Sequence, residues 1–294
     1  MRDRGSQTAE VMALFRALET VEPPRERLFS DRYAERFLRP AGRLLLLVAR
    51  VPPVRRRIHR ILDRKWPGAR TSAVARTRLA DDLLRNALSN GTRQLLILGA
   101  GFDTRAYRLP EIASARIFEV DHPFTQAAKI RLIGRASAQS GAITHVPVDL
   151  NRQTLDGALR GSAFDSNARS FVLWEGVTNY LTETAVDVTL RAIAASLSPG
   201  SELFFTYVHR GLLDGSREFD GGAEILQRVR NVGEPWTCGI EPSEMPSYLR
   251  TRGFALVEDL SADDYRARYF GDAARAMKGY SFYRAVLARR IPHG

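Results

Sequence analysis

The sequence has few of the residues that form disulfides and metal sites, and it has no long apolar run. Its 294 residues contain one cysteine, Cys238, which excludes an intrachain disulfide and a cysteine zinc site; we expect a buried, neutral thiol. The five histidines are isolated in sequence and predict no metal site. The longest apolar run begins at Leu44, is broken by Arg50 and is too short to cross a bilayer. No apolar segment typical of a secretion signal follows the first residues, so we expect a cytoplasmic protein.

Lysine is also scarce, and the net charge of +11 comes almost wholly from arginine. Residues 36–78 hold thirteen basic residues and one acid, Asp63. Such a segment could bind nucleic acid, anionic lipid or an anionic substrate. Over residues 54–62, however, apolar residues recur at helical spacing, which favours a buried stripe with the arginines in solvent. Because this stripe would be buried, and because aromatic residues for base stacking are nearly absent there, we expect neither a membrane nor a nucleic-acid partner.

What the sequence does contain is a strand that leads into a glycine turn. Residues 95–98 form a continuous apolar run, typical of a strand covered on both faces by helices. Gly99 and Gly101 then allow a tight turn with no Cβ between the backbone and a ligand. Asp121 ends a second apolar segment about twenty residues later, where an acid can accept hydrogen bonds from both ribose hydroxyls of a nucleoside cofactor.

The third glycine of the dinucleotide fingerprint is missing, because Thr104 occupies its position. That glycine permits close helix packing beside a pyrophosphate, and a cofactor without a diphosphate does not need it. The pattern therefore favours S-adenosylmethionine as the cofactor and makes a nicotinamide dehydrogenase the least favoured enzyme class.

Beyond this turn, strands and helices alternate along the chain, which predicts right-handed βαβ units and a doubly wound, mostly parallel sheet. We expect a helix from Thr71 or Ser72, either of which can cap it, to Asn90, and a helix over 183–197 capped by Thr182. Two late strands would close the sheet with an antiparallel edge hairpin. The expected strands are 94–98, 116–120, 144–148, 170–174, 202–208, 254–259 and 280–289, and the other expected helices lie near 104–108, 123–138, 153–160, 224–230 and 242–252.

These elements predict an α/β protein with a seven-stranded sheet and two additions. Residues 1–70 form a helical cap or substrate lid, and residues 71–294 form the main domain. Within that domain, the glycine-rich segment 209–240 interrupts the alternation, and we expect it to be an insertion over the site.

Several short motifs along the chain, taken together and in this order, match the pattern of a known family. The series resembles the leucine carboxyl methyltransferase family, especially its bacterial branch of small-molecule O-methyltransferases, from about Phe29 to Leu287. The motifs are Ala75-Arg76-Thr77, Leu98-Gly-Ala-Gly-Phe-Asp-Thr-Arg105, Phe118-Glu-Val-Asp121, Val148-Asp-Leu150, Glu175 and Tyr180.

The resemblance implies the class I methyltransferase (Rossmann-like) fold and an S-adenosylmethionine cofactor. It implies that Arg76 meets the carboxylate of the cofactor's methionine moiety, that Gly99 and Gly101 lie against this moiety, and that Asp121 holds the ribose. The chain departs from the eukaryotic members in its arginine-dense segment 39–65 and in its insertion, so their phosphatase substrate does not carry over. The remaining implied roles are Asp149 and Leu150 beside the adenine, Glu175 near the cofactor's ammonium and Tyr180 near the substrate.

The methyl acceptor is predicted from the absence of a base. A carboxylate is ionised at neutral pH and needs no general base, whereas a phenol has a pKa near 10 and normally needs one. We therefore expect an S-adenosylmethionine-dependent O-methyltransferase that esterifies a carboxylate of a small or peptidic metabolite, as a monomer or homodimer. The alternatives are phenol or enol O-methylation assisted by His209 or Tyr180, and, from a different class, a nucleic-acid-binding protein that uses segment 36–78.

Overall fold

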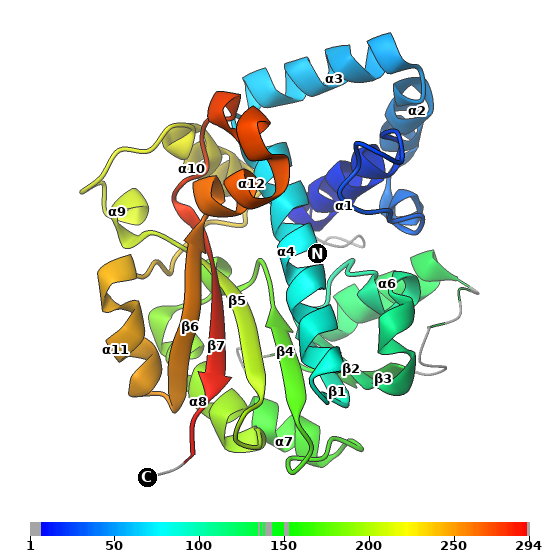
Figure 1. Cartoon of the computed structure of the whole chain (residues 1–294). Helices are drawn as coiled ribbons and strands as arrows, with labels where there is room; N and C mark the ends of the chain where they lie inside the picture. Colours follow the sequence, from blue (N-terminus) through cyan, green and yellow to red (C-terminus); the bar gives the residue numbers. More distant parts are fainter. Residues whose placement is uncertain (1–6, 135, 137, 139–142, 150–152, 293–294) are drawn as a thin grey trace.

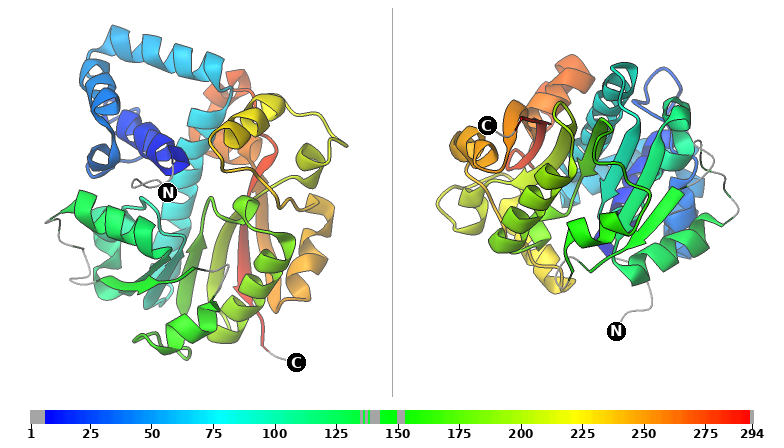
Figure 2. Two further views of the ribbon diagram at one scale, coloured as in Figure 1. Left: turned by 180° about the vertical axis from the view of Figure 1, so that it is seen from behind. Right: turned by 90° about the horizontal axis from the view of Figure 1, so that it is seen from below.

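A seven-stranded sheet between two layers of helices forms the centre of the structure (Figures 1 and 2). The computed structural model describes residues 7–134, 136, 138, 143–149 and 153–292. The strands are β1 (Gln94–Leu98), β2 (Arg116–Asp121), β3 (Ile143–Pro147), β4 (Ser170–Trp174), β5 (Glu202–Val208), β6 (Phe254–Ser261) and β7 (Tyr283–Arg290). Their order is β3-β2-β1-β4-β5-β7-β6, and β7 is antiparallel to both of its neighbours, while the pairs from β3 through to β5 are parallel. The predicted fold class is confirmed.

Helices pack on both faces of this sheet. The α-helices are α1 (Gln7–Thr20), α2 (Pro40–Ala49), α3 (Pro52–Lys65), α4 (Ala69–Ser89), α5 (Arg105–Arg108), α6 (Pro123–Ile133), α7 (Leu155–Arg160), α8 (Glu183–Ser196), α9 (Arg210–Leu213), α10 (Gly222–Asn231), α11 (Met245–Arg250) and α12 (Ala262–Phe270). Five short 3-10 helices join them: η1 (Ala34–Phe37), η2 (Pro110–Ser114), η3 (Thr178–Tyr180), η4 (Pro242–Glu244) and η5 (Gly271–Ala276).

The apolar run of β1 supplies both cores. Leu95 and Ile97 belong to the buried cluster with α1, α4 and α12, whereas Leu96 and Leu98 belong to the cluster with α7, α8 and α11. The chain winds from β1 outward to β3 and then returns to β4 on the other side of β1. The carboxyl ends of β1 and β4 therefore form the topological switch point, where ligands bind in open α/β sheets.

The far edge of the sheet differs from the predicted hairpin. Strands β6 and β7 pair antiparallel, but α12 and η5 connect them instead of a tight turn, and α12 packs against α4. Helix α12 was not predicted. The last strand begins at Tyr283 and not at Tyr280, because Tyr280 adopts a left-handed conformation with φ of 65°.

Helix α4 also begins earlier than expected. It starts at Ala69 after Gly68, which has φ of 79°, so the prediction that Thr71 or Ser72 caps it is wrong. Both side chains are buried, and Ser72 Oγ is 2.7 Å from the hydroxyl of Tyr265 on α12. The cap of α8 is confirmed, since the Thr182 side chain accepts a hydrogen bond from the backbone of Ala185.

The first seventy residues pack onto the same core as the sheet. Phe15 of α1 and Phe37 of η1 belong to the buried cluster that contains Leu95 and Ile97. Helices α2 and α3 extend from this core as an arch at the upper right of Figure 1. Among the described residues, no helix is both long enough and apolar enough to cross a lipid bilayer.

The predicted buried stripe of α3 is only partly correct. Ile58 and Leu62 are buried, but Ile61 is 53% exposed. Arg55 takes a buried position instead, where its Nε lies 3.0 Å from a carboxylate oxygen of Glu22. The ion pair compensates the burial of this guanidinium, and periodicity of apolar residues cannot reveal such a partner.

Glu19, near the end of α1, provides a test of packing in this N-terminal segment. Burial raises the pKa of its carboxyl from 4.5 to about 7, while its oxygen accepts the backbone N–H of Leu28. Ionising it in the folded state costs nothing below pH 4.5, and the cost grows to its full value above pH 7. We expect Glu19→Gln to raise the free energy of unfolding by about 2–3 kcal/mol at pH 8.5 and to change it little at pH 4.5.

The measurement is urea unfolding at both pH values. Glu26→Gln is the control, because Glu26 is exposed. An equal effect of Glu19→Gln at the two pH values would contradict this explanation.

Candidate functional site

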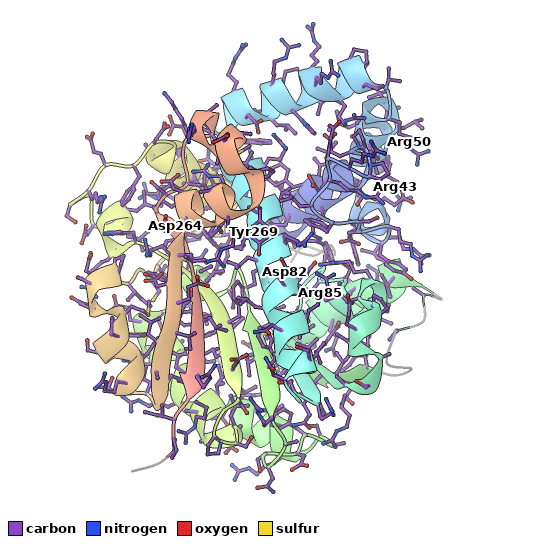
Figure 3. The ribbon with its side chains drawn as sticks, in the orientation of Figure 1. Arg43, Arg50, Asp82, Arg85, Asp264 and Tyr269 are labelled. Atoms are coloured by element: carbon purple, nitrogen blue, oxygen red, sulfur yellow. The ribbon has the colours of Figure 1, made fainter. Side chains whose placement is uncertain are left out.

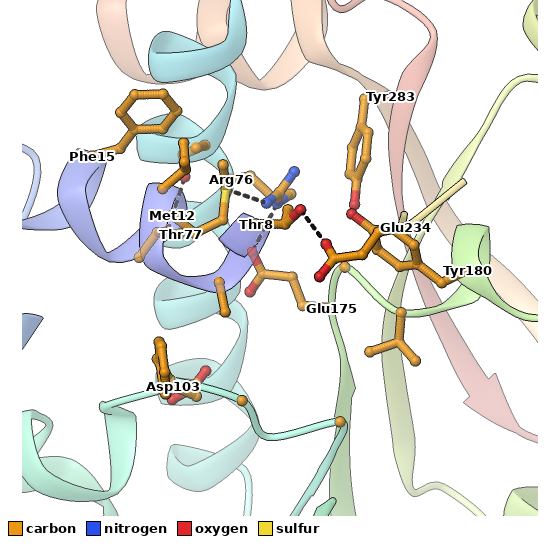
Figure 4. A pocket seen from close by; sticks show the side chains of 18 of the residues that line it. Thr8, Met12, Phe15, Arg76, Thr77, Asp103, Glu175, Tyr180, Glu234 and Tyr283 are labelled. Atoms are coloured by element: carbon orange, nitrogen blue, oxygen red, sulfur yellow. Dashed lines mark hydrogen bonds and ion pairs between the residues drawn. The ribbon is translucent and has the colours of Figure 1, made fainter. Parts of the chain in front are cut away.

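A cavity of about 620 Å³ lies at the carboxyl ends of β1 and β4. Its walls come from α1, α4, the turn after β1, the segment after β4 and the region of α10 (Figure 4). It is therefore located at the switch point, and residues of the N-terminal segment and of segment 209–240, the predicted insertion, line it. Of the predicted site residues, it brings together Arg76, Gly99, Gly101, Asp121, Glu175 and Tyr180.

The turn after β1 depends on its two glycines for different reasons. Gly99 has φ of 62°, and a Cβ there would lie 2.4 Å from Cγ2 of Val177. Gly101 has φ of 42°, but the nearest atom to a Cβ there would be the Gly99 carbonyl oxygen at 3.7 Å. A side chain at Gly99 would collide with the protein, whereas one at Gly101 would occupy open space that a ligand can use.

Asp121, at the end of β2, stabilises this turn through hydrogen bonds. Its carboxylate accepts hydrogen bonds from the backbone N–H groups of Gly101, at 2.5 Å, and His122, at 2.6 Å. Burial raises the pKa of Asp121, and the two N–H donors oppose that rise. The acid is thus fixed against the glycine turn at the edge of the cavity.

Thr104 has a structural role at the position of the missing third glycine. Its hydroxyl donates to Oδ2 of Asp31, 2.7 Å away, and this carboxylate also pairs with Arg16 of α1 at 2.9 Å. Arg16 in turn donates to the carbonyl of Phe102 in the turn. The threonine therefore ties the N-terminal segment to the glycine turn.

A network of buried charges joins α4 to the turn and to the end of β4. Nε of Arg76 lies 2.8 Å from Oε1 of Glu175, and Arg105 Nη2 lies 3.1 Å from Oε2 of the same carboxylate. Arg105 also pairs with Asp81, 2.8 Å from its Nε, and with Asp103. Burial alone would raise the pKa of Glu175, but Arg105 and Arg76 hold it below its usual range.

The roles of Arg105, Asp81 and Asp103 were not predicted from the sequence. Asp103 and Arg105 stand in the glycine-turn motif, which is the signal that was available. Burial would raise the pKa of Asp103, but Arg105 and Lys129 lower it to about 2. Asp81 carries no motif, and only the fold brings it from α4 to Arg105.

Aromatic side chains line the opposite part of the cavity, toward the insertion. Tyr180 lies edge-on to Trp236 with ring centroids 6.4 Å apart, and Tyr283 stacks on the Arg76 guanidinium at 4.5 Å. Burial raises the pKa of Tyr180 to about 12, so its hydroxyl is protonated at neutral pH. It can donate a hydrogen bond there but cannot act as a base.

The insertion and the first helix meet across this part of the cavity. The hydroxyl of Thr8 on α1 donates to Glu234 after α10, at 2.6 Å (Figure 4). Neither residue belongs to a motif, so this contact was not predictable from the sequence. It closes the cavity between two segments that are far apart in the chain.

Arg228 on α10 differs from the other arginines that line the cavity. Its guanidinium stacks over the ring of Trp66 at 4.1 Å, and no carboxylate of the described residues pairs with it. The other four cavity arginines each pair with at least one carboxylate: Arg16 with Asp31, Arg76 with Glu175, Arg105 with Asp81, Asp103 and Glu175, and Arg108 with Asp81.

Two of the described residues that were predicted for the site, His209 and Asp149, do not line this cavity. His209 caps α9, and its Nδ1 accepts the backbone N–H of Gly211 at 3.0 Å. Burial lowers the pKa of its imidazole. Asp149 follows β3, is half-buried and is not among the described lining residues. Leu150 lies outside the described residues.

Comparisons with known proteins agree with this architecture. The family model described as leucine carboxyl methyltransferase matches residues 9–194. A relative from Streptomyces avermitilis is 35% identical over 277 residues, covering 92% of this chain and 94% of its own. One from Frankia alni is 36% identical over 213 residues, 71% of each chain. Both are named "Putative S-adenosyl-L-methionine-dependent methyltransferase".

Solved structures show the same fold at low sequence identity. A protein from Thermobifida fusca described as "a putative methyltransferase" has a TM-score of 0.61 at 18% identity, covering 99% of this chain and 96% of its own. A DUF574 family protein from Streptomyces avermitilis has a TM-score of 0.59 at 15% identity, covering 97% and 98%.

The two glycines of the turn should respond differently to alanine. We expect Gly101→Ala to lower the free energy of unfolding by about 1–2 kcal/mol, the cost of the left-handed conformation. Gly99→Ala adds a collision with Val177 and should lower it by about 2–4 kcal/mol. Adding Val177→Ala to Gly99→Ala should restore the part of the lost unfolding free energy that comes from the collision.

Urea unfolding of the two single variants and the double variant forms the corresponding double-mutant cycle. The same cycle with Gly101→Ala is the control, and it should be additive. Strict additivity of Gly99→Ala with Val177→Ala would show that the collision is not what demands glycine.

Proposed function

This chain belongs to the leucine carboxyl methyltransferase family, and on that premise we propose that it is an S-adenosylmethionine-dependent O-methyltransferase that esterifies a carboxylate of a small or peptidic metabolite. The observation that carries the acceptor is Arg228, a guanidinium at the aromatic wall with no carboxylate partner among the described residues. An arginine fork suits a carboxylate.

The glycine-turn side of the cavity fits the cofactor. A Cβ at Gly101 would take up open space above the turn, so bare backbone is available for close approach. Asp121 would hold the ribose hydroxyls with the lone pairs that its two backbone donors leave free. Asp149 and Leu150 would lie beside the adenine.

Arg76 and Glu175 would recognise the amino-acid end of the cofactor. The guanidinium of Arg76 uses its Nε for Glu175 and keeps further N–H groups for a carboxylate. Glu175 stays ionised because two arginines lower its pKa, so it can attract an ammonium. Their mutual ion pair fixes both side chains before the cofactor binds, which reduces the entropy lost on binding.

S-adenosylmethionine supplies an electrophilic methyl group when bound. The protein's own contribution is alignment, which can lower the barrier of a displacement by roughly 7–11 kcal/mol. Arg228 would bind one oxygen of the acceptor carboxylate and leave the other free as the nucleophile. Tyr180 would orient the acceptor through its protonated hydroxyl.

The lack of a histidine or a tyrosinate base in the described cavity lining supports the carboxylate over a phenol. Tyr180 retains its proton at neutral pH, with a pKa of about 12. His209 caps α9, and no histidine occurs among the described residues that line the cavity. A carboxylate acceptor needs no proton removed, so this set of side chains is sufficient for it.

Arg228 provides the test of the acceptor site. We expect Arg228→Gln to raise KM for the carboxylate roughly 10- to 100-fold, the equivalent of one charge-assisted hydrogen bond, with a smaller change in kcat. Arg230→Gln is the matched control, because Arg230 is exposed on the same helix and does not line the cavity. Steady-state kinetics give KM, and calorimetric titration with S-adenosylmethionine should give the same Kd for both variants.

If Arg228→Gln leaves KM unchanged while the cofactor still binds, the assignment of Arg228 is wrong. If the wild-type protein takes up no S-adenosylmethionine, the proposed function itself fails.

The pH profile and the product separate the two acceptor classes. With a carboxylate acceptor, kcat/KM should be flat above about pH 6, because the nucleophile is already ionised and needs no base. The product should be an ester that base hydrolyses. Product mass after incubation at high pH is the measurement. Tyr180→Phe should lower the activity only modestly, because it removes an orienting hydrogen bond and no base. A rate that rises with pH together with a base-stable product would favour the phenol or enol acceptor.

A further inference from the structure

The arch formed by α2 and α3 exposes an unusual number of large apolar side chains. Ten such side chains are exposed among the described residues, and six of them lie within this arch. The arch lies at the end of the molecule away from β3 and the carboxyl terminus (Figure 1). The six are Leu44, Leu47, Val48, Val51, Val54 and Ile61.

On α2 these side chains form one continuous ridge. Leu44, Leu47 and Val48 follow the i, i+3, i+4 spacing of a single helix face, and they are 62%, 58% and 39% exposed. Leu46 and Ala49 are buried on the opposite face. Helix α2 is therefore anchored by one side and presents a second apolar side to solvent, which soluble proteins rarely do without a partner.

Arginines border the ridge and cover the outer face of α3. Arg43 and Arg50 project at the outer side of α2 (Figure 3). No carboxylate of the described residues pairs with them. The four exposed arginines of α3 likewise lack a described carboxylate partner: Arg56, Arg57, Arg60 and Arg64.

The acids of this region are already engaged elsewhere. Asp63, the single acid among residues 36–78, pairs with Arg70 at 2.7 Å. Glu22 pairs with the buried Arg55. The exposed surface of the arch is thus apolar and cationic, without a compensating negative charge from these side chains.

We propose that this surface, the ridge of α2 with the outer face of α3, docks onto an anionic lipid bilayer. The aliphatic side chains would enter the boundary between headgroups and acyl chains, and the arginines would contact the headgroups. This revises the expectation of no membrane partner, which assumed that the apolar residues of the segment are buried.

Other occupants fit the surface less well. A second copy of the chain would bring two sets of unpaired arginines together. Nucleic acid would place phosphates against an aliphatic ridge, and Trp66, the one aromatic side chain of residues 39–66, already stacks with Arg228. The residues that carry most of the binding energy at protein interfaces are enriched in tryptophan, tyrosine and arginine, and leucine and valine are under-represented among them.

The experiment is sedimentation of the full chain with vesicles of phosphatidylcholine alone or of phosphatidylcholine rich in phosphatidylglycerol. We expect at least tenfold stronger binding to the anionic vesicles, lost progressively with added salt because salt screens the arginines. Arg56→Gln with Arg57→Gln should weaken binding about 25-fold, since each basic residue near such a surface contributes about fivefold. Leu44→Ser with Leu47→Ser should weaken it at least about tenfold.

Two matched pairs control for general effects of surface polarity and charge. Val188→Ser with Val257→Ser removes exposed apolar side chains from α8 and β6, and Arg250→Gln with Arg275→Gln removes charges from α11 and η5. Both pairs should bind vesicles as the wild type does. The α2 and α3 variants should keep the wild-type Tm and the wild-type rate with a water-soluble acceptor, so this test is independent of the proposed methyl transfer.

Three results would overturn the proposal. The first is no binding to the anionic vesicles, and the second is equal binding by all four variant pairs. The third is a Leu44→Ser/Leu47→Ser variant that changes the molecular mass in solution from dimer to monomer and leaves vesicle binding intact, which would assign the ridge to self-association.

Discussion

The buried guanidinium of Arg105 is the interaction on which the site depends. It is 3% exposed and pairs with Asp81 on α4, Asp103 in the glycine turn and Glu175 after β4. A buried charge of this kind is tolerated only when it is fully paired, and removing one partner typically costs 3–5 kcal/mol. One side chain therefore fixes the relative positions of α4, the glycine turn and the segment after β4. These segments carry the site residues Arg76, Gly101 and Glu175.

The same constraint links the N-terminal segment to the cavity. Thr104 adjoins Arg105, and its hydrogen bond to Asp31 joins the turn to the segment that contains Arg16. A glycine at this position, as in dinucleotide-binding proteins, would lose that bond. Two physical reasons thus explain why threonine replaces the third glycine. A cofactor without a diphosphate does not require the space that glycine leaves, and the N-terminal segment is held by the threonine hydroxyl.

Sequence-based predictions were correct where the interactions are local in the chain and wrong where they join residues far apart in it. The strand at 94–98 and the Thr182 cap were predicted correctly, because a continuous apolar run and a capping hydroxyl act within a few residues. The start of α4 was wrong, because Gly68 packs against carbonyls of Lys278 and Gly279, more than two hundred residues away. Helix α12 was not predicted. The predicted apolar stripe of α3 was wrong at Arg55, which is buried because it forms an ion pair with Glu22.

The sequence by itself determined the doubly wound sheet, the glycine turn and the acid at the end of β2, since apolar periodicity and backbone freedom are local properties. Only the tertiary structure decided which charges meet. It paired Glu175 with two arginines, placed His209 outside the described cavity lining, left Arg228 facing the cavity without a described carboxylate partner and exposed the ridge of α2. The partners of these buried charges lie far apart in the chain, and no local pattern in a single sequence predicts that they will be in contact.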